Sequence, residues 1–454
     1  MDEIITPFTA ELPPGISTIP LLRSAYFKDI PIIHLGDGVY QLGWGSKARK
    51  LDRSTIDTDS AIGSKLSQNK VFTANILKMG GLPAPIHGIA TTKESALNLS
   101  KKLTYPVVIK PIDLDRGEGV SVNIRNEVQL FEAFEHAITL SKSKNIIVEK
   151  YVDGICHRLF MMNHELLYAV NRLPISVKGD GVKTVSELID DANIGEEKKA
   201  PWIRGKPFPR DEKAIEAIAQ CGFDLNSVPS EETWVPLRDI ESGRWGGRSE
   251  DVTAFIHPSN LDIAIRACKL FELNVVGVDI ITTDISKPWY ETGAIINEIN
   301  YAPMIGRSEP SRKYLHTYLD RLIGGNGRII IEVFIGSDEK TMRKAKNCHK
   351  FLLKEGKKCY WTTDDLTLDP SSKEVHFPSN RIADRTQALL LNANVESLIL
   401  LIKNDELLHS FIPFDKVSKI TVVSNDIYSY MDTNKVVSEV DFVKLLGKFC
   451  TDKK

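Results

Sequence analysis

A short apolar strand that ends in a lysine and runs into a glycine-rich loop places the tightest limit on this chain's fold. In the segment YPVVIKPIDLDRGEGV (105–120), three apolar residues precede Lys110, and Arg116-Gly117-Glu118-Gly119 follows an acidic turn. Apolar runs bounded by turn residues are typical of buried strands. A lysine there directs its ammonium group to one spot, and glycines let backbone N–H groups approach an anion. The segment therefore fits a nucleotide triphosphate site, with an ordinary hairpin and glycine turn as the alternative.

The bulk composition excludes several classes of protein. The chain has 454 residues, which predicts two or three domains, and a formal net charge of −2, which offers no field for nucleic acid or a membrane surface. No apolar run approaches the roughly 20 residues that cross a bilayer, and the N-terminus shows no secretory signal. The six cysteines form no C-x-x-C pair, which argues against zinc and against a disulfide scaffold. We therefore expect a cytoplasmic protein.

Alternating strand and helix patterns predict an α/β fold in three parts. Residues 1–68 form a small mixed unit, and residues 69–325 a central domain. Within the latter, residues of about 177–250 are rich in glycine, proline and charge, and we expect an irregular lid or substrate loop there. A cluster of glycine and asparagine at 323–327 marks the next boundary. Residues 326–454 then read as a smaller α/β domain with parallel-sheet character.

Two strands near residue 300 bring together oxygen-bearing side chains. Glu298 and Asn300 flank Ile299, so the two-residue period of a strand puts both on one face. Asp279 ends another apolar strand, VVGVD. Two carboxylates and an amide oxygen suit Mg²⁺ that carries substrate phosphates. The alternative is that these residues only form turns, but a carboxylate between apolar residues in INEIN needs a cation or donors.

Further charged residues stand at positions that suit a nucleotide or an anion. Lys70 opens a helical pattern, where a cation opposes the helix dipole unless an anion binds there. Glu149 and Lys150 end the strand IIVEK, where backbone groups and a carboxylate can read adenine and ribose, although this signal is weak alone. Arg158 and Arg172 lie on neighbouring strands of a predicted hairpin and suit a phosphate or carboxylate. Solvated surface arginines are the alternative for that pair.

Taken in order, these motifs resemble one family of ligases. The motifs are NK (69–70), VVIKP (107–111), DRGEGV (115–120), VEKYVDG (148–154), HRLF (157–160), NRLP (171–174), GGRSEDVT (246–253), GVDI (277–280) and NEINYAP (297–303). Their order resembles the ATP-grasp ligases, and among these the cyanophycin synthetases. The similarity also covers LGDGVYQLGWGSKARKLDRSTIDTDSAI (35–62), KGDGVKTVSELI (178–189) and SVP…VPLR (227–238). Nine ordered motifs are far more specific than one glycine loop.

The resemblance implies an ATP-grasp fold, preceded by a small α/β unit, and a role for each matching position. The ATP-binding positions are Lys70, Lys110, Arg116, Gly117, Glu118, Gly119, Glu149, Lys150 and Val152. The Mg²⁺ ligands are Asp279, Glu298 and Asn300. Arg158 and Arg172 are the catalytic positions, facing the phosphoryl group or the substrate carboxylate. Substrate contacts are His157, Arg238, Arg244 and Arg248.

The resemblance also implies a reaction. In this class the γ-phosphate of ATP passes to a carboxylate, and an amine then displaces phosphate from the acyl phosphate to form an amide. Such chemistry depends on positioning and charge neutralisation, so no protein nucleophile is needed. The implied cofactors are ATP and Mg²⁺, the partners are small carboxylate and amine substrates, and we expect a homo-oligomer.

The C-terminal part departs from the family. GRIIIEVFIGSDEKTMRKAKN (327–347) aligns with the phosphate loop of a Mur-ligase-like, Rossmann-like module, but Glu339 stands where the inner glycine belongs. Leu401 occupies the place of that module's metal carboxylate, and Ser429 and Tyr430 replace an Asp-His pair. The sequence also ends before the module's final domain. We therefore expect a truncated, degenerate module without its own ATP site.

These departures bear on the substrate. The segment SGRWGG (242–247) stands where the family usually reads N-L-S-T-G-G, so the substrate choice is open. We expect one amide or peptide bond to be formed on an amino acid or small peptide-like acid, in specialised metabolite biosynthesis. The alternatives are ligation of a cyanophycin-related polymer or dipeptide, and a non-catalytic nucleotide-binding scaffold or regulator of another ligase. Retention of all three metal-binding residues favours an enzyme.

Overall fold

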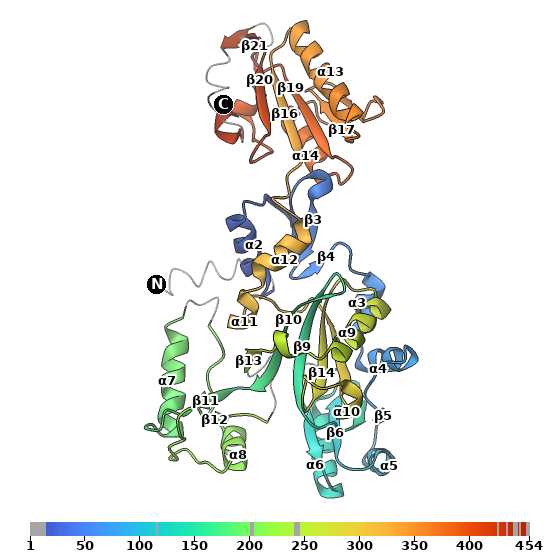
Figure 1. The fold of residues 1–454 in the computed structure, drawn as a ribbon, viewed down its shortest axis with the longest axis vertical. Helices are drawn as coiled ribbons and strands as arrows, with labels where there is room; N and C mark the ends of the chain where they lie inside the picture. Colours follow the sequence, from blue (N-terminus) through green and yellow to red (C-terminus); the bar gives the residue numbers. More distant parts are fainter. Residues whose placement is uncertain are drawn as a thin grey trace. The chain divides into compact units, whose positions relative to one another are not determined.

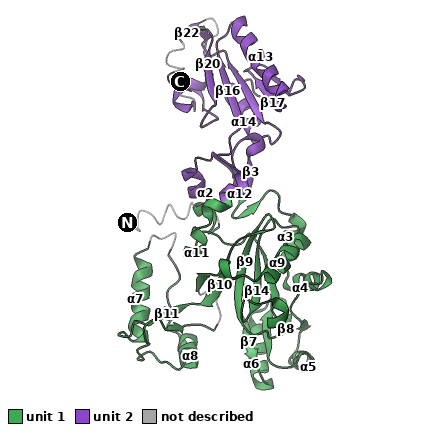
Figure 2. Ribbon diagram, in the orientation of Figure 1, with its two compact units in different colours: residues 1–20, 52–318 green, residues 21–51, 319–454 purple. Residues whose placement is uncertain are grey.

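The computed structural model describes residues 15–114, 117–199, 204–239, 246–424, 426–432, 435–438, 444 and 446–450. Its elements are mixed α/β (Figure 1). The chain divides into two units (Figure 2): residues 1–20 and 52–318 form the larger unit, and residues 21–51 and 319–454 form the smaller unit. The chain passes between them within α2 (Thr18–Phe27), β3 (Arg49–Asp52) and α12 (Leu315–Ile323). The three-part division expected from the sequence stays a prediction.

A five-stranded antiparallel sheet forms the centre of the larger unit. Its order is β13 (Gly247–Asp251), β10 (Glu165–Pro174), β9 (Ile155–Met162), β14 (Val275–Thr282) and β15 (Ile295–Tyr301). Along β9 and β14 alternate side chains point to opposite faces, as strand geometry requires. Leu159 and Val278 belong to a buried apolar cluster, whereas their neighbours Arg158 and Asp279 face the other side. The sheet is therefore apolar on one face and charged on the other.

Three helices pack against the apolar face and its edge. They are α3 (Ala61–Ser67), α4 (Lys70–Met79) and α9 (Pro258–Phe271). In α9 the buried residues Ile263, Ala264, Ala267 and Phe271 recur at helical spacing. The helix begins with Pro258 in its first turn and ends at Glu272, which has left-handed backbone angles. These start and stop signals set the bounds of the helix at Pro258 and Phe271.

A four-stranded sheet carries the lysine strand and the glycine loop. Its order is β5 (His87–Ala90), β8 (Ile146–Lys150), β6 (Val107–Pro111) and β7 (Ser121–Ile124), and all its strand pairs are antiparallel. Helices α5 (Lys93–Leu103) and α6 (Glu127–Leu140) pack on it through an apolar cluster. The side chains of Thr92 and Asn126 cap these two helices. The predicted buried strands VVIK and IIVEK are confirmed.

The expectation of an irregular segment at 177–250 is wrong for much of its length. Between them, β11 (Ser176–Lys178), β12 (Trp234–Pro236), α7 (Val185–Glu197) and α8 (Glu212–Gln220) enclose an apolar cluster of their own. Thr184 caps α7 in a capping box with Glu187, and Asp211 caps α8. The glycine- and proline-rich sequence on either side of these caps led to the prediction of a loop in place of the two helices. Two short helices, α10 (Trp289–Thr292) and α11 (Glu309–Arg312), complete the larger unit's helices.

The smaller unit contains a parallel sheet. Its order is β18 (Thr367–Leu368), β17 (Cys359–Thr362), β19 (Ser397–Ile402), β16 (Ile330–Ile335) and β20 (Lys419–Val422), and only the β17–β18 pair is antiparallel. Helices α13 (Glu339–Lys354) and α14 (Ile382–Leu391) pack on opposite faces, each in its own apolar cluster. The predicted parallel-sheet character is therefore confirmed.

Shorter elements accompany that sheet. The hairpin of β1 (Ile32–Gly36) and β2 (Val39–Leu42) precedes it in the chain, whereas β4 (Thr55–Ile56) belongs to the larger unit. The short α15 (Glu406–His409), β21 (Asp426–Tyr428) and β22 (Val436–Ser438) follow it. Among the described helices of both units, none is long and apolar enough to span a membrane.

Candidate functional site

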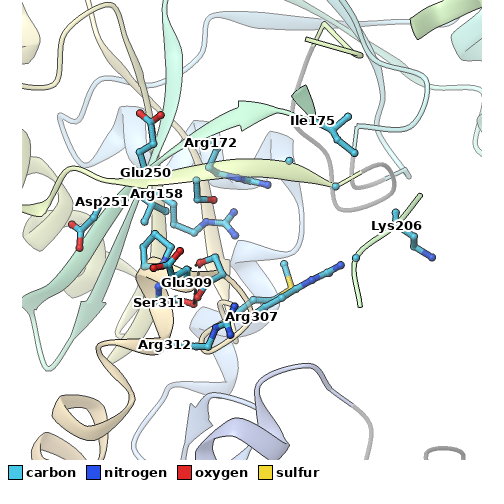
Figure 3. A pocket seen from close by; sticks show the side chains of 18 of the residues that line it. Arg158, Arg172, Ile175, Lys206, Glu250, Asp251, Arg307, Glu309, Ser311 and Arg312 are labelled. Carbon is cyan, nitrogen blue, oxygen red and sulfur yellow. Dashed lines mark hydrogen bonds between the residues drawn. The ribbon is translucent and has the colours of Figure 1, made fainter. Parts of the chain in front are cut away.

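Two of the cavities in the larger unit share Arg172 in their walls. The smaller cavity, of about 340 Å³, is lined by many of the predicted ATP and metal positions: Lys70, Lys110, Gly117, Glu149, Val152, Asp279 and Glu298. The larger cavity, of about 710 Å³, is lined by Arg158, by residues of β10 and β13, and by the loop 304–313 (Figure 3). The charged face of the five-stranded sheet thus supplies walls to both cavities.

Asp279 lies at the centre of a charged row across this sheet. Strand register places it directly opposite Arg158 on β9 and opposite Glu298 on β15. Directly opposed residues share a sheet face, so all three side chains point the same way. Arg172 reaches the row from the next strand, β10, where its neighbour two residues back, Val170, stands opposite Arg158. The pairing of four strands therefore gathers two carboxylates and two guanidinium groups in one place.

The carboxylate of Asp279 is occupied on both oxygens. Arg158 donates from Nε to Oδ1 and from Nη2 to Oδ2, each at 2.7 Å, which is a bidentate pair. Oδ2 also accepts from Arg172 Nη1 at 2.9 Å and from Asn300 Nδ2 at 3.3 Å. Burial raises the pKa of Asp279, but the two guanidinium groups outweigh it and hold that pKa below its ordinary value. For Arg158, burial alone would lower the pKa, but the neighbouring carboxylate of Asp279 raises it above its ordinary value. Arg158 therefore stays charged.

Gly277 makes room for the buried guanidinium group. Its position opposite Asn300 puts it beside Arg158, and a Cβ built there would lie 3.3 Å from Arg158 Cδ and Nε and 3.1 Å from Pro303 Cβ. A side chain at this position would therefore crowd the guanidinium group of Arg158, which would have to shift by a few tenths of an ångström. The glycine in GVDI is explained by this close approach.

The oxygen donors at this edge of the sheet fit a hard divalent cation. Glu298 is half-buried, lines the smaller cavity and has no hydrogen bond or ion pair with any described residue. In the described ranges, no cluster of three or more His, Cys, Asp or Glu side chains could hold a metal. Two carboxylates and one amide would leave part of the coordination shell to phosphates and water, as is usual for Mg²⁺. Asp279 differs from Glu298, because its oxygens already carry four donors.

Lys110 and Glu149 form an ion pair inside the smaller cavity. Their atoms Nζ and Oε2 are 2.7 Å apart, and the two side chains are only 13% and 7% exposed. Neighbouring antiparallel strands place them diagonally, since Glu149 pairs with Val108 and Lys110 with Ile147. Lys70 enters the same cavity from the first turn of α4, and its Nζ donates to the carbonyl oxygen of Leu114 at 2.8 Å. Two cations therefore stand at the rim of the glycine loop.

Other predicted ATP positions lie in different surroundings. Gly117 lines the smaller cavity, whereas Glu118 and Gly119 line a neighbouring hollow beside Asp211. Gly119 has φ +70°, and a Cβ there would lie 2.8 Å from Pro111 Cγ, so glycine is required. Lys150 Nζ donates to the carbonyl oxygen of Thr104 at 3.0 Å, so its side chain leaves the cavity and only its backbone stays beside Val152. Arg116 lies outside the described residues.

The predicted substrate contacts are not brought together. His157 points to the apolar face, opposite to Arg158, and burial lowers its pKa. Arg238 is buried against Asp211 and the carbonyl oxygen of Leu237, and lines neither cavity. Arg248 pairs with Glu250 and stacks on Trp234, with its guanidinium carbon 3.9 Å from the ring centroid. Arg244 lies outside the described residues. We therefore assign His157 and Arg238 structural roles.

Sequence reasoning missed most of the larger cavity. Its basic side chains, besides Arg158 and Arg172, are Lys199, Lys206, Arg307, Arg312 and Lys313, and its acidic ones are Glu196, Glu250, Asp251 and Glu309. The three basic residues at 307–313 follow NEINYAP directly, and that proximity to the predicted metal site was the available signal. Tyr168, which stacks on Tyr314 with ring centroids 4.9 Å apart, forms part of the wall.

In the smaller unit, the segment that resembles a phosphate loop leads into helix α13. Asp338 caps α13, and its Oδ1 accepts from the backbone N–H of Thr341 at 2.7 Å. Leu401 is 1% exposed in the apolar core of the sheet. Ser429 is buried and Tyr430 is exposed. A carboxylate therefore occupies the helix N-terminus that would face a phosphate, and loss of that ATP site stays a prediction.

Comparisons with known proteins agree with this geometry. Residues 70–159 match the family described as "Carbamoyl-phosphate synthase L chain, ATP binding domain". Cyanophycin synthetase of Synechocystis sp. is 30% identical over 417 residues, which cover 88% of this chain and 47% of that protein. The glutathione biosynthesis bifunctional protein GshAB of Mannheimia succiniciproducens is 30% identical over 60% of this chain and 37% of its own.

A solved structure is similar to this chain in fold. The bifunctional glutathione synthetase of Pasteurella multocida has a TM-score of 0.52 and 27% identity, covering 68% of this chain and 44% of that one. The chain thus spans less than half the length of the curated cyanophycin synthetases that it matches.

Proposed function

Because the chain is homologous to cyanophycin synthetases over most of its length and has the ATP-grasp fold, we propose that it is an ATP-dependent carboxylate–amine ligase. The reaction would pass the γ-phosphate of ATP to a carboxylate and release ADP. An amine would then attack the acyl phosphate, forming the amide and expelling phosphate.

One observation carries this proposal. The smaller cavity brings two lysines, Lys70 and Lys110, which would bind phosphate, to the same space as the oxygen donors Asp279 and Glu298. These four residues come from α4, β6, β14 and β15, which are far apart in the chain. A triphosphate needs cations along its length and a divalent ion across its oxygens. This cavity offers the cationic side chains and the oxygen donors that would hold the divalent ion. No single sequence motif predicts that these residues line one cavity.

The chain's own residues would act by positioning and charge. Glu149 holds the ammonium group of Lys110 in place, so that little reorganisation is needed when a phosphate arrives. Asp279 holds Arg158 charged and oriented in a largely buried position. Glu298, Asn300 and Asp279 would hold Mg²⁺. When bound, Mg²⁺ neutralises the charge on the phosphate oxygens.

The larger cavity is the proposed place for the carboxylate and amine substrates. Arg172 lies between this cavity and the nucleotide side, so a carboxylate bound here by Arg172 would be next to the γ-phosphate. Arg307 and Arg312 add positive charge, whereas Glu309 supplies negative charge that suits an ammonium group. This mixture favours an amino acid or a small peptide-like acid as substrate. Assembly as a homo-oligomer stays a prediction.

A mass-spectrometric screen tests the proposal. The full chain would be incubated with ATP, Mg²⁺ and pairs of amino acids or dipeptides. We expect ADP, phosphate and a product whose mass equals the two substrates less one water. Release of AMP would contradict acyl-phosphate chemistry, and no nucleotide turnover with any pair would favour a nucleotide-binding scaffold instead.

A further inference from the structure

We propose that Arg172 and a divalent cation compete for the same oxygen of Asp279, so that cation binding turns the guanidinium group of Arg172 toward the larger cavity. The inference rests on the cation site of the proposed function. It assigns Arg172 as the positioning residue that links nucleotide binding to substrate binding. The competition would operate within the larger unit alone.

The donors on Asp279 differ in how firmly they are held. Arg158 makes two hydrogen bonds of 2.7 Å to both oxygens, and its side chain is 12% exposed. Toward Asp279, Arg172 donates one hydrogen bond of 2.9 Å, to Oδ2, and its side chain is 20% exposed. A bidentate pair is harder to separate than a single contact. An incoming cation would therefore displace Arg172 and leave Arg158 in place.

Oδ2 is the crowded oxygen of this carboxylate. It accepts from Arg158, Arg172 and Asn300, whereas Oδ1 accepts from Arg158 alone. A carboxylate oxygen has about two lone-pair directions, so a third donor is already shared. Because Glu298 stands opposite Asp279 in the strand register, a cation bound by both would approach from the side of the smaller cavity. Arg172 lines that cavity too and would meet the cation there.

The charges around Asp279 also favour displacement of Arg172 by a cation. Arg158 and Arg172 balance Asp279 and Glu298, two against two, on one largely buried sheet face. A divalent cation added to this balanced set would repel the guanidinium groups, and repulsion is strong where solvent is excluded. Arg172 has a polar place to go, because it also lines the larger cavity (Figure 3), where Ser249 stands directly opposite it in the strand register. In that direction it would meet the substrate carboxylate.

The consequence is a coupling between the two cavities. If cation binding releases Arg172 toward the substrate, the acid must bind more tightly when the cation is present. Linkage requires the reverse effect to be equal, so the acid would tighten cation binding by the same factor. Binding of the metal nucleotide before the acid would then be the favoured order.

Titration with Mn²⁺ tests the competition directly. Binding of Mn²⁺ in the presence of ADP would be followed by electron paramagnetic resonance for the wild type, Arg172→Gln and Arg172→Lys. The matched control is Arg307→Gln, which removes a charge from the larger cavity without touching Asp279. We expect Arg172→Gln to bind Mn²⁺ about tenfold more tightly, the value of one charge-assisted hydrogen bond. Arg172→Lys should lie between, and Arg307→Gln within twofold of the wild type.

The outcomes separate the two claims. No Mn²⁺ binding by the wild type would overturn the cation site of the proposed function and this inference with it. Mn²⁺ binding that changes equally in Arg172→Gln and Arg307→Gln would overturn the competition alone, because it would reflect only general charge.

A second measurement observes Arg172 in the wild-type protein. In the ¹⁵N-arginine spectrum of the wild type, addition of Mg²⁺ and ADP should shift the signal that is missing from Arg172→Lys. An unchanged signal for Arg172 in the presence of bound Mg²⁺ and ADP would contradict the proposal. This arm keeps the test decisive if Arg172→Gln does not fold.

Discussion

Lys110 Nζ and Glu149 Oε2 lie 2.7 Å apart across neighbouring antiparallel strands, and both side chains line the smaller cavity. The pair holds a cation in one orientation in a place from which water is largely excluded. A phosphate that arrives there meets a charge already in position. Lys110 and Glu149, both predicted to bind ATP, therefore bind each other in this structure.

Replacing Lys110 tests this role. Lys110→Met should weaken ATP binding at least tenfold, because a charge-assisted hydrogen bond to phosphate contributes about 1.5–3 kcal/mol. It should also lower the melting temperature, since Glu149 would be left buried without its partner. Calorimetric titration with ATP measures the first effect and a thermal melt the second. Lys101→Met is the control, because Lys101 forms only an exposed ion pair with Glu127; an equal loss of ATP affinity in both variants would refute the assignment.

The oxygen donors make a separate prediction. Glu298→Gln should abolish ATP-dependent phosphate release while leaving the protein folded, because it removes a negative charge that has no hydrogen bond or ion pair among the described residues. Phosphate release and circular dichroism would be measured on the same preparation. Glu291→Gln, on the surface helix α10, should keep both properties of the wild type. Unchanged turnover in Glu298→Gln would remove the cation-binding role from this position.

The buried imidazole of His157 predicts a pH dependence of stability. Burial lowers its pKa below the ordinary value of 6.5, so the unfolded chain binds a proton at a higher pH than the folded chain does. Stability should therefore be full above about pH 6.5 and fall as the pH drops below it. His157→Gln should flatten this decline between pH 7.5 and pH 5 in thermal melts. Replacement of the exposed His136 by Gln is the control. If stability falls with pH equally in the wild type and in His157→Gln, the prediction is contradicted.

The smaller unit should be dispensable for ATP chemistry. Lys340 sits in the first turn of α13, whose N-terminus is already capped by the carboxylate of Asp338. Lys340→Ala should therefore leave the ligation rate within about twofold of the wild type. Steady-state rates at saturating ATP would measure this. A loss of tenfold or more would show that a second nucleotide site operates here.

Local signals in the sequence predicted the elements well. The period of two along NEINY placed Glu298 and Asn300 on one face, and the strand register adds Asp279, which stands opposite Glu298. The same period should have removed His157 from the list of substrate contacts. It is adjacent to Arg158 on one strand, so the two must point to opposite faces.

Long-range packing explains what could not be predicted. No spacing reveals that Arg158 makes a bidentate pair with a residue 121 positions away, or that Gly277 leaves the space for it. The wall of the larger cavity comes from β10, β13, described residues between 196 and 199 and between 205 and 208, and the segment 304–313, which only the folded chain brings together. The helices α7 and α8 had clear caps, but their glycine- and proline-rich surroundings suggested a loop.

Isotope transfer tests the central claim most directly. Once a substrate pair is identified, the acid would be labelled with ¹⁸O in its reacting carboxylate, and the products would be weighed by mass spectrometry. An acyl phosphate requires one ¹⁸O atom to leave with the released phosphate, together with ADP. Phosphate free of ¹⁸O, or ¹⁸O found in AMP, would contradict the proposed ligase.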